Sequence, residues 1–116
     1  MNSANVYKIL RAPDWAEARR AGAIEGSPLD RADGFIHLSS GAQTAQTLAL
    51  HFAGEEGLVL VAFDGDRLGA ALKWEPSRGG DLFPHYFGAL SLADALWSAP
   101  LSLGADGAHI LPDDMT

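Results

Sequence analysis

Apolar and polar residues alternate near the start of the chain, and this pattern predicts a first strand over residues 6–10. Lys8 then lies on the opposite face from Tyr7, because successive side chains of a strand point to opposite sides. Lys8 could turn into the cleft of the sheet or into water, and water is the expected surrounding of its ammonium group. Helical spacing follows and predicts a helix over residues 13–22, with proline in its first turn and glycine at its end.

A second alternating segment, Phe35–Ser39, predicts another strand. His37 and Ser39 would share one face of it, opposite the aliphatic residues Ile36 and Leu38. Residues 26–34 are rich in glycine, serine, proline and aspartate, which predicts a loop before the strand. A serine at its end can cap a second helix, whose apolar stripe runs over Ala45–Phe52.

The remaining sequence is typical of strands joined by turns. Six consecutive apolar residues, 58–63, predict a central strand buried on both faces. Further extended segments and polar turns are expected, in chain order, at 64–66 (turn), 72–75 (strand), 77–81 (loop), 83–90 (strand), and 95–103 with 108–111 (a final hairpin). Because helices and strands do not alternate regularly, we expect one α+β domain over 1–116. Its sheet should be mixed or mostly antiparallel, with two short N-terminal helices.

Composition narrows the classes of partner. The 116 residues carry 8 basic and 15 acidic side chains, and the net charge of −7 argues against nucleic acid or an anionic membrane. Cysteine is absent, which excludes disulfides, thiolate metal sites and cysteine nucleophiles. No apolar run reaches the roughly 18 residues of a membrane span, and the first residues lack signal-peptide features. We therefore expect a cytoplasmic protein with a small-molecule ligand, of unknown oligomeric state.

The strand that carries His37 and Ser39 offers the first candidate site. Both side chains would lie on one face, and the next helix would begin beside them with its free N–H groups. A histidine, a hydroxyl and a helix N-terminus together could bind a nucleotide or a phosphate. The alternative is that His37 is a hydrogen-bonded interior residue and Ser39 only a helix cap.

Two further candidates lie later in the chain. Glu75 follows Trp74, and a carboxylate beside an indole can be desolvated in a way that suits acid or base work. The alternative, which the pattern favours, is that Trp74 packs in the core and Glu75 is a solvated charge at the rim. His85 stands between proline and aromatic residues, which restrict its rotamers; such rigidity is useful in a site, and ordinary packing also produces it. His37, Glu75 and His85 are residue types that could ligate iron or zinc; their spacing neither supports nor excludes such a site, and no metal is favoured. The sequence contains no dinucleotide-binding glycine motif, P-loop or nucleophile elbow.

The chain resembles a small bacterial family known as domain of unknown function 952, over residues 6–112. The likeness is carried by Tyr7-Lys8-Ile9, Trp15, Asp33-Gly34-Phe35-Ile36-His37-Leu38-Ser39, Gln43, Trp74-Glu75 and Phe83-Pro84-His85. That family has been grouped with the ADP-ribosyltransferase-like fold. The segment around His37 also looks like the Val-His-Leu-Ser segment of RNA 2′-phosphotransferases, which use NAD. The resemblance implies a cofactor-binding role for Lys8, Ser39 and Gln43, and catalytic roles for His37, Glu75 and His85.

Two departures from these relatives limit what the resemblance implies. The family pattern is Pro-His-x-Tyr-Gly, and this chain has Phe87 where the pattern has tyrosine. Tyr86 stands one place earlier and would point to the other face of a strand. The arginines form no phosphate-binding cluster, which argues against an RNA substrate. We therefore expect an enzyme acting on NAD or on an ADP-ribosylated small molecule. The alternatives are a noncatalytic nucleotide- or small-ligand-binding domain and, third, a metal-dependent enzyme.

Overall fold

A five-stranded antiparallel sheet forms the centre of the computed structural model, which describes residues 5–112 and 115. The strand order is β10-β9-β5-β1-β4, with bounds β1 (Asn5–Leu10), β4 (Ser39–Ser40), β5 (Leu58–Asp64), β9 (Ala95–Leu103) and β10 (His109–Ile110). The apolar run 58–63 lies in β5, paired with β1 on one side and β9 on the other. The prediction of a central buried strand and the prediction of a final hairpin are therefore confirmed.

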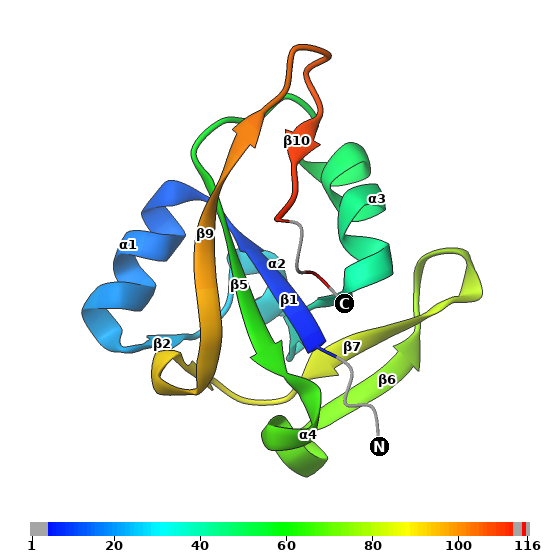
Figure 1. Ribbon diagram of the computed structural model, residues 1–116. Coiled ribbons are helices and arrows are strands. Elements are labelled where there is room, and N and C mark those ends of the chain that lie inside the picture. Colours follow the sequence, from blue (N-terminus) through cyan, green and yellow to red (C-terminus); the bar gives the residue numbers. More distant parts are fainter. Residues whose placement is uncertain (1–4, 113–114, 116) are drawn as a thin grey trace.

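Two helices, α1 (Ala12–Ala21) and α3 (Gly41–His51), cover opposite faces of this sheet (Figure 1). Ala18 of α1 packs with Val6 and Leu10 of β1, whereas Leu48 of α3 packs with Tyr7 and Ile9. The alternation of β1 thus supplies both cores. Both helices predicted from the sequence are confirmed, and α1 ends at a left-handed glycine as expected.

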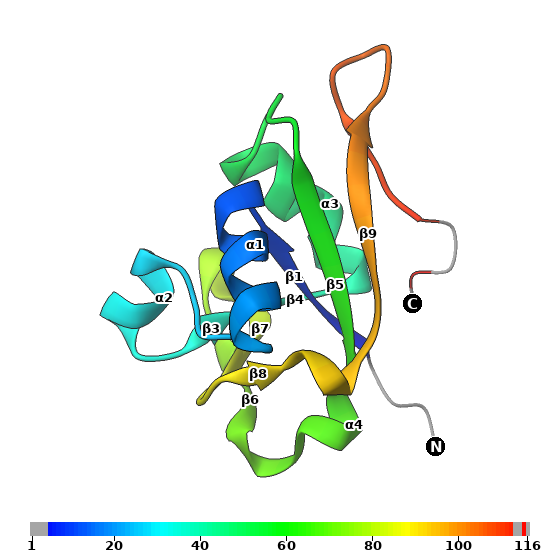
Figure 2. The same ribbon diagram turned by 90° about the vertical axis from the view of Figure 1, so that its left-hand side faces the viewer.

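Two smaller sheets complete the α+β fold. Their strands are β2 (Ala23–Ile24) with β8 (Leu90–Ser91), and β3 (Ile36–His37) with β7 (Leu82–Tyr86) and β6 (Leu72–Pro76). Figure 2 shows α2 (Pro28–Asp33), β3 and β7 together on the side of the molecule away from β9. The remaining short elements are α4 (Gly65–Leu68) and single 3-10 turns at Gly69–Ala71, Arg78–Gly80 and Leu92–Asp94.

Three local expectations are wrong. Residues 26–34 are not all loop, because Ser27 caps α2 through a reciprocal hydrogen-bond pair with Asp30. The described part of the chain therefore has four helices instead of the two expected, and α4 stands where the sequence predicts a turn at 64–66. The segment 35–39 is not one strand either. It changes partner at Leu38, so that β3 joins β7 and β4 joins β1.

The dimensions agree with one compact domain. The radius of gyration is 13.4 Å, close to the roughly 13 Å expected for a domain of about 100 residues. Among the described residues, no helix combines the length and apolar character needed to cross a membrane.

Candidate functional site

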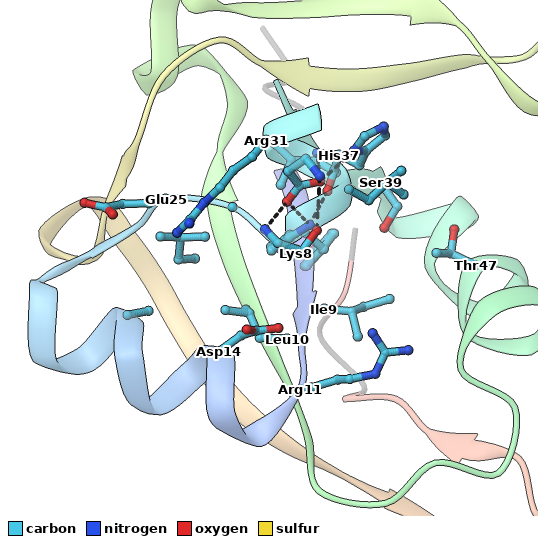
Figure 3. A pocket seen from close by; sticks show the side chains of 18 of the residues that line it. Lys8, Ile9, Leu10, Arg11, Asp14, Glu25, Arg31, His37, Ser39 and Thr47 are labelled. Carbon is cyan, nitrogen blue, oxygen red and sulfur yellow. Dashed lines mark hydrogen bonds and ion pairs between the residues drawn. The ribbon is translucent and has the colours of Figure 1, made fainter. Parts of the chain in front are cut away.

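A cavity of about 680 Å³ opens beside β1. Within the described chain, β4 pairs with Val6 and Tyr7 only, so the edge of β1 from Lys8 to Leu10 has no neighbouring strand on that side. The cavity lies against this edge, and Figure 3 shows it between α1 and α3 with Lys8, His37 and Ser39 at one end. Its volume falls within the roughly 300–1,000 Å³ of small-molecule sites.

The cavity wall combines apolar and charged side chains. Apolar surface comes from α1, β1, β2 and β7, for example from Ala18, Leu10, Ile24 and Phe83. Both signs of charge are present among the lining residues: Lys8, Arg11 and Arg31 are basic, and Asp14, Glu17, Glu25 and Asp30 are acidic. A ligand that is partly apolar and carries both signs of charge would match such a wall.

Lys8 is buried in this wall and is held by a carboxylate. Its Nζ lies 2.8 Å from Oδ2 of Asp30 and donates at 3.1 Å to the carbonyl oxygen of His37. The expected exposure of Lys8 to water is therefore wrong, since its side chain is only 11% exposed. The ion pair provides the compensation that a buried ammonium group needs. The sequence pattern does not single out Asp30, because it predicts a loop at this position.

Asp30 joins three parts of the fold through its two carboxylate oxygens. Oδ2 accepts from Lys8 and from the backbone N–H of Ser27, while Oδ1 accepts from the backbone N–H of His37 and lies 2.6 Å from its Nδ1. Burial alone would raise the pKa of Asp30. The charge of Lys8 and the hydrogen bonds from Lys8, His37 and Ser27 outweigh it, so the pKa lies below its usual value.

His37 is held between two carboxylates. Its Nδ1 faces Asp30, and its Nε2 lies 3.0 Å from Oδ2 of Asp33. An imidazolium ring donates from both nitrogens and would satisfy both acceptors. His37 lines the cavity, and the geometry commits both of its nitrogens to protein groups.

His85 lies next to His37, because β3 and β7 pair these two residues directly. The centroids of the two rings are 5.5 Å apart, and Phe35 stacks on His85 at 4.1 Å. Glu75 of β6 accepts from Nδ1 of His85 at 2.8 Å. The structure thus brings together the three residues that the sequence proposed as catalytic.

Glu75 differs from the two histidines in its surroundings. In the described part of the chain, His37 and His85 line the cavity, whereas Glu75 reaches it only through His85. The Glu75 side chain is 41% exposed, which agrees with a solvated charge at the rim, and Trp74 is 39% exposed instead of packing in the core. Glu75 is therefore placed to orient His85 and not to touch a ligand.

Ser39 and Gln43 occupy different positions. Ser39 is 2% exposed, lines the cavity and lies 2.9 Å from the hydroxyl of Thr44. Gln43 stands in the first turn of α3, where its Oε1 accepts from the N–H of Ser40 and its Nε2 donates to the carbonyl of Leu82. Among the described residues Gln43 is outside the cavity wall, and its contacts tie α3 to β7.

No cluster of three or more histidine, aspartate or glutamate side chains in residues 5–112 has an arrangement that could hold a metal ion. In the suggested triad, Nδ1 of His85 already binds Glu75, and both ring nitrogens of His37 already face Asp30 and Asp33. The metal-dependent alternative gains no support from this geometry.

Comparison with known proteins now places the chain in a family. Residues 9–98 match the family described as "Protein of unknown function (DUF952)", and the chain belongs to it. It is similar to protein CC0527 from Caulobacter crescentus. The X-ray structure of that protein superposes on this one with a TM-score of 0.86 and a sequence identity of 46%, and the match covers 91% of this chain and 93% of that chain. Its solution NMR structure is 47% identical, with a TM-score of 0.81 over 90% of each chain. No match was found among curated proteins.

Proposed function

We propose that this protein is a cytoplasmic bacterial enzyme with an ADP-ribosyltransferase-like fold, and that it acts on NAD or on an ADP-ribosylated small molecule. The observation that carries the proposal is the cavity beside the open edge of β1, with Lys8, His37 and Ser39 at one end. These are residues to which the likeness with NAD-using enzymes gives a role in the cleft. The mixed charge of the wall also suits NAD, which combines two phosphates with a pyridinium cation.

His85 is the proposed base. Glu75 accepts from Nδ1, so the proton of a neutral His85 ring sits there and Nε2 carries the lone pair. In hydrolysis, water attacks C1′ of the nicotinamide ribose, His85 takes the proton of that water, and nicotinamide leaves with the electron pair of the broken N-glycosidic bond. Glu75 holds the ring in its tautomer and steadies the positive charge that develops on it.

Lys8 and His37 would bind instead of transferring protons. The ammonium group of Lys8 has three N–H donors, of which Asp30 and the carbonyl of His37 take two. The third can be donated to a phosphate or hydroxyl oxygen of the ligand. His37, held by Asp30 and Asp33, contributes the face and edge of its ring to the wall.

A noncatalytic ligand-binding domain is the second candidate. One observation favours it: both nitrogens of His37 and one nitrogen of His85 are committed to carboxylates, and Glu75 does not touch the cavity. Few groups are then left for chemistry, while the cavity itself is unaffected. This candidate predicts saturable binding without turnover.

The test is a thermal-shift titration of the untagged protein with NAD, ADP-ribose and nicotinamide, followed by an assay for released nicotinamide. A ligand at 100 times its dissociation constant adds about 2.7 kcal/mol to stability, which should raise the melting temperature by about 10 °C. His37→Ala should weaken binding about tenfold, or roughly 1.4 kcal/mol. His109→Ala is the matched control, because His109 bonds a backbone carbonyl and does not line the cavity in the described chain.

The outcomes separate the candidates. Nicotinamide release that is lost in His85→Ala but retained in His109→Ala supports the enzyme. Binding with intact NAD after long incubation supports the binding domain. No shift with any of the three ligands would refute both assignments of this cavity to NAD-type ligands.

A further inference from the structure

A chain of hydroxyl groups leads from the helix α3 to the cavity wall. Thr44, which is fully buried, donates from Oγ1 to the carbonyl oxygen of Ser40 at 2.8 Å. The same Oγ1 lies 2.9 Å from Oγ of Ser39. Ser39 in turn lines the cavity, where Figure 3 shows it beside His37 and Lys8.

Either hydroxyl of the Ser39–Thr44 contact could be the donor, and the assignment that makes both contacts hydrogen bonds sets the direction of this chain. A hydroxyl group has one proton to donate and two lone pairs that accept. The carbonyl of Ser40 can only accept, so the proton of Thr44 is spent on it. Thr44 must then accept from Ser39, and the proton of Ser39 is spent on Thr44. The hydroxyl of Ser39 then has no proton left to donate, and only its lone pairs can interact with a ligand.

We infer that Ser39 faces the cavity as a hydrogen-bond acceptor only, and that it selects ligands that place a neutral donor against it, such as a primary amide or a hydroxyl. A ketone or a carboxylate at that position would set acceptor against acceptor, which leaves a buried polar group without a partner. The inference rests on the proposed function only for the choice of dinucleotide probes below. The direction of the hydroxyl chain is independent of it.

The direction is tested first, without any ligand. Neutron diffraction from deuterated crystals locates the deuterium of each hydroxyl. We expect the deuterium of Ser39 to point at Oγ1 of Thr44, and that of Thr44 to point at the carbonyl of Ser40. A deuterium on Thr44 that points at Ser39 would overturn the inference outright.

Selectivity is tested with NAD and its 3-acetylpyridine analogue, in which a methyl group replaces the amide nitrogen. The two probes have the same charge and nearly the same shape, and they differ in the donor. The wild-type protein should bind NAD about tenfold more tightly. Ser39→Ala should bring the ratio of dissociation constants close to one, because no acceptor remains.

Thr44→Val is the sharper variant, because it leaves Ser39 in place and removes the group that takes its proton. Ser39 could then donate to the acetyl oxygen, so the ratio should fall through tighter binding of the analogue. Ser102→Ala, on the exposed side of β9, is the control and should keep the wild-type ratio. Melting temperatures confirm that each variant is folded.

The two failures are distinguishable. If the wild-type protein binds neither dinucleotide, the proposed function fails, and the deuterium positions still decide the direction of the hydroxyl chain. If both bind and the ratio is unchanged in Ser39→Ala and Thr44→Val, the selective role of Ser39 is refuted while the NAD proposal stands.

Discussion

The substitution Asp30→Asn tests the buried charges most directly. Asp30→Asn keeps the size of the side chain but removes its negative charge, and Lys8 is left as a buried cation without its partner. The change also disturbs the hydrogen bonds. Both oxygens of Asp30 face two donors each, so the NH₂ group of asparagine would meet donors in either orientation.

The expected loss follows from this geometry. Removing one member of a buried, hydrogen-bonded ion pair costs about 3–5 kcal/mol, a large part of the roughly 5–15 kcal/mol that holds such a domain together. For a chain of this length the melting temperature should fall by about 10–20 °C. Lys8→Met should cost less, because the carboxylate of Asp30 keeps its donors from Ser27 and His37.

The assay is urea unfolding at pH 7, followed by circular dichroism, on both single variants and the double variant. A shift in the midpoint with an unchanged slope reports stability alone. The double variant should be more stable than the sum of the single losses predicts, by about 1–3 kcal/mol. If Asp30→Asn stays within about 1 kcal/mol of the wild type, or if the two losses simply add, the Lys8–Asp30 pair does not anchor the site.

Four further measurements follow from named contacts. Folding lowers the pKa of Asp30, so the stabilisation from its carboxylate is present above the unfolded pKa of 3.8 and is lost as pH falls through the lower folded pKa. Urea midpoints measured from pH 6 to 2 should therefore fall less steeply below pH 4 in Asp30→Asn than in the wild type. Ser40→Ala removes the reciprocal cap of α3 and should cost about 1 kcal/mol in urea unfolding. Leu60→Ala, at a fully buried position of β5, should cost about 2–5 kcal/mol by the same assay. Arg11→Ala breaks an exposed ion pair with Glu55 and should lower the free energy of unfolding by less than about 1 kcal/mol; a larger loss there would show that burial is not what sets the strength of these pairs.

Local patterns were enough to predict the large elements. The apolar run of β5 and the helical stripes of α1 and α3 depend on residues close in sequence, and the structure confirms all three. The α2 helix could also have been found. Ser27 and Asp30 stand three residues apart with proline between them, which is the spacing of a helix cap with proline in the first turn. Glycine, serine and proline are also common in loops, so composition alone predicts a loop at this position.

The contacts between distant residues could not be derived in the same way. Asp30 lies 22 residues from Lys8, and His37 lies 48 residues from His85. Alternation tells which face of a strand a side chain occupies, but it does not tell which strand lies beside it. The sequence therefore suggested Lys8, His37 and His85 one by one, and it contained no signal that Asp30 would join the first two.

The change of partner at Leu38 accounts for both the cavity and its polar end. If residues 36–38 had continued along β1, they would have covered the edge of Lys8–Leu10, and no space would remain between α1 and α3. Instead β3 pairs with β7, which opens that edge and sets His37 beside His85. Asp30 then binds the backbone and the ring of His37 as well as Lys8, so it fixes the point where the two sheets separate. The same residues that hold the sheets apart thus line the space between them, and a substitution that weakens this junction should affect stability and ligand binding together.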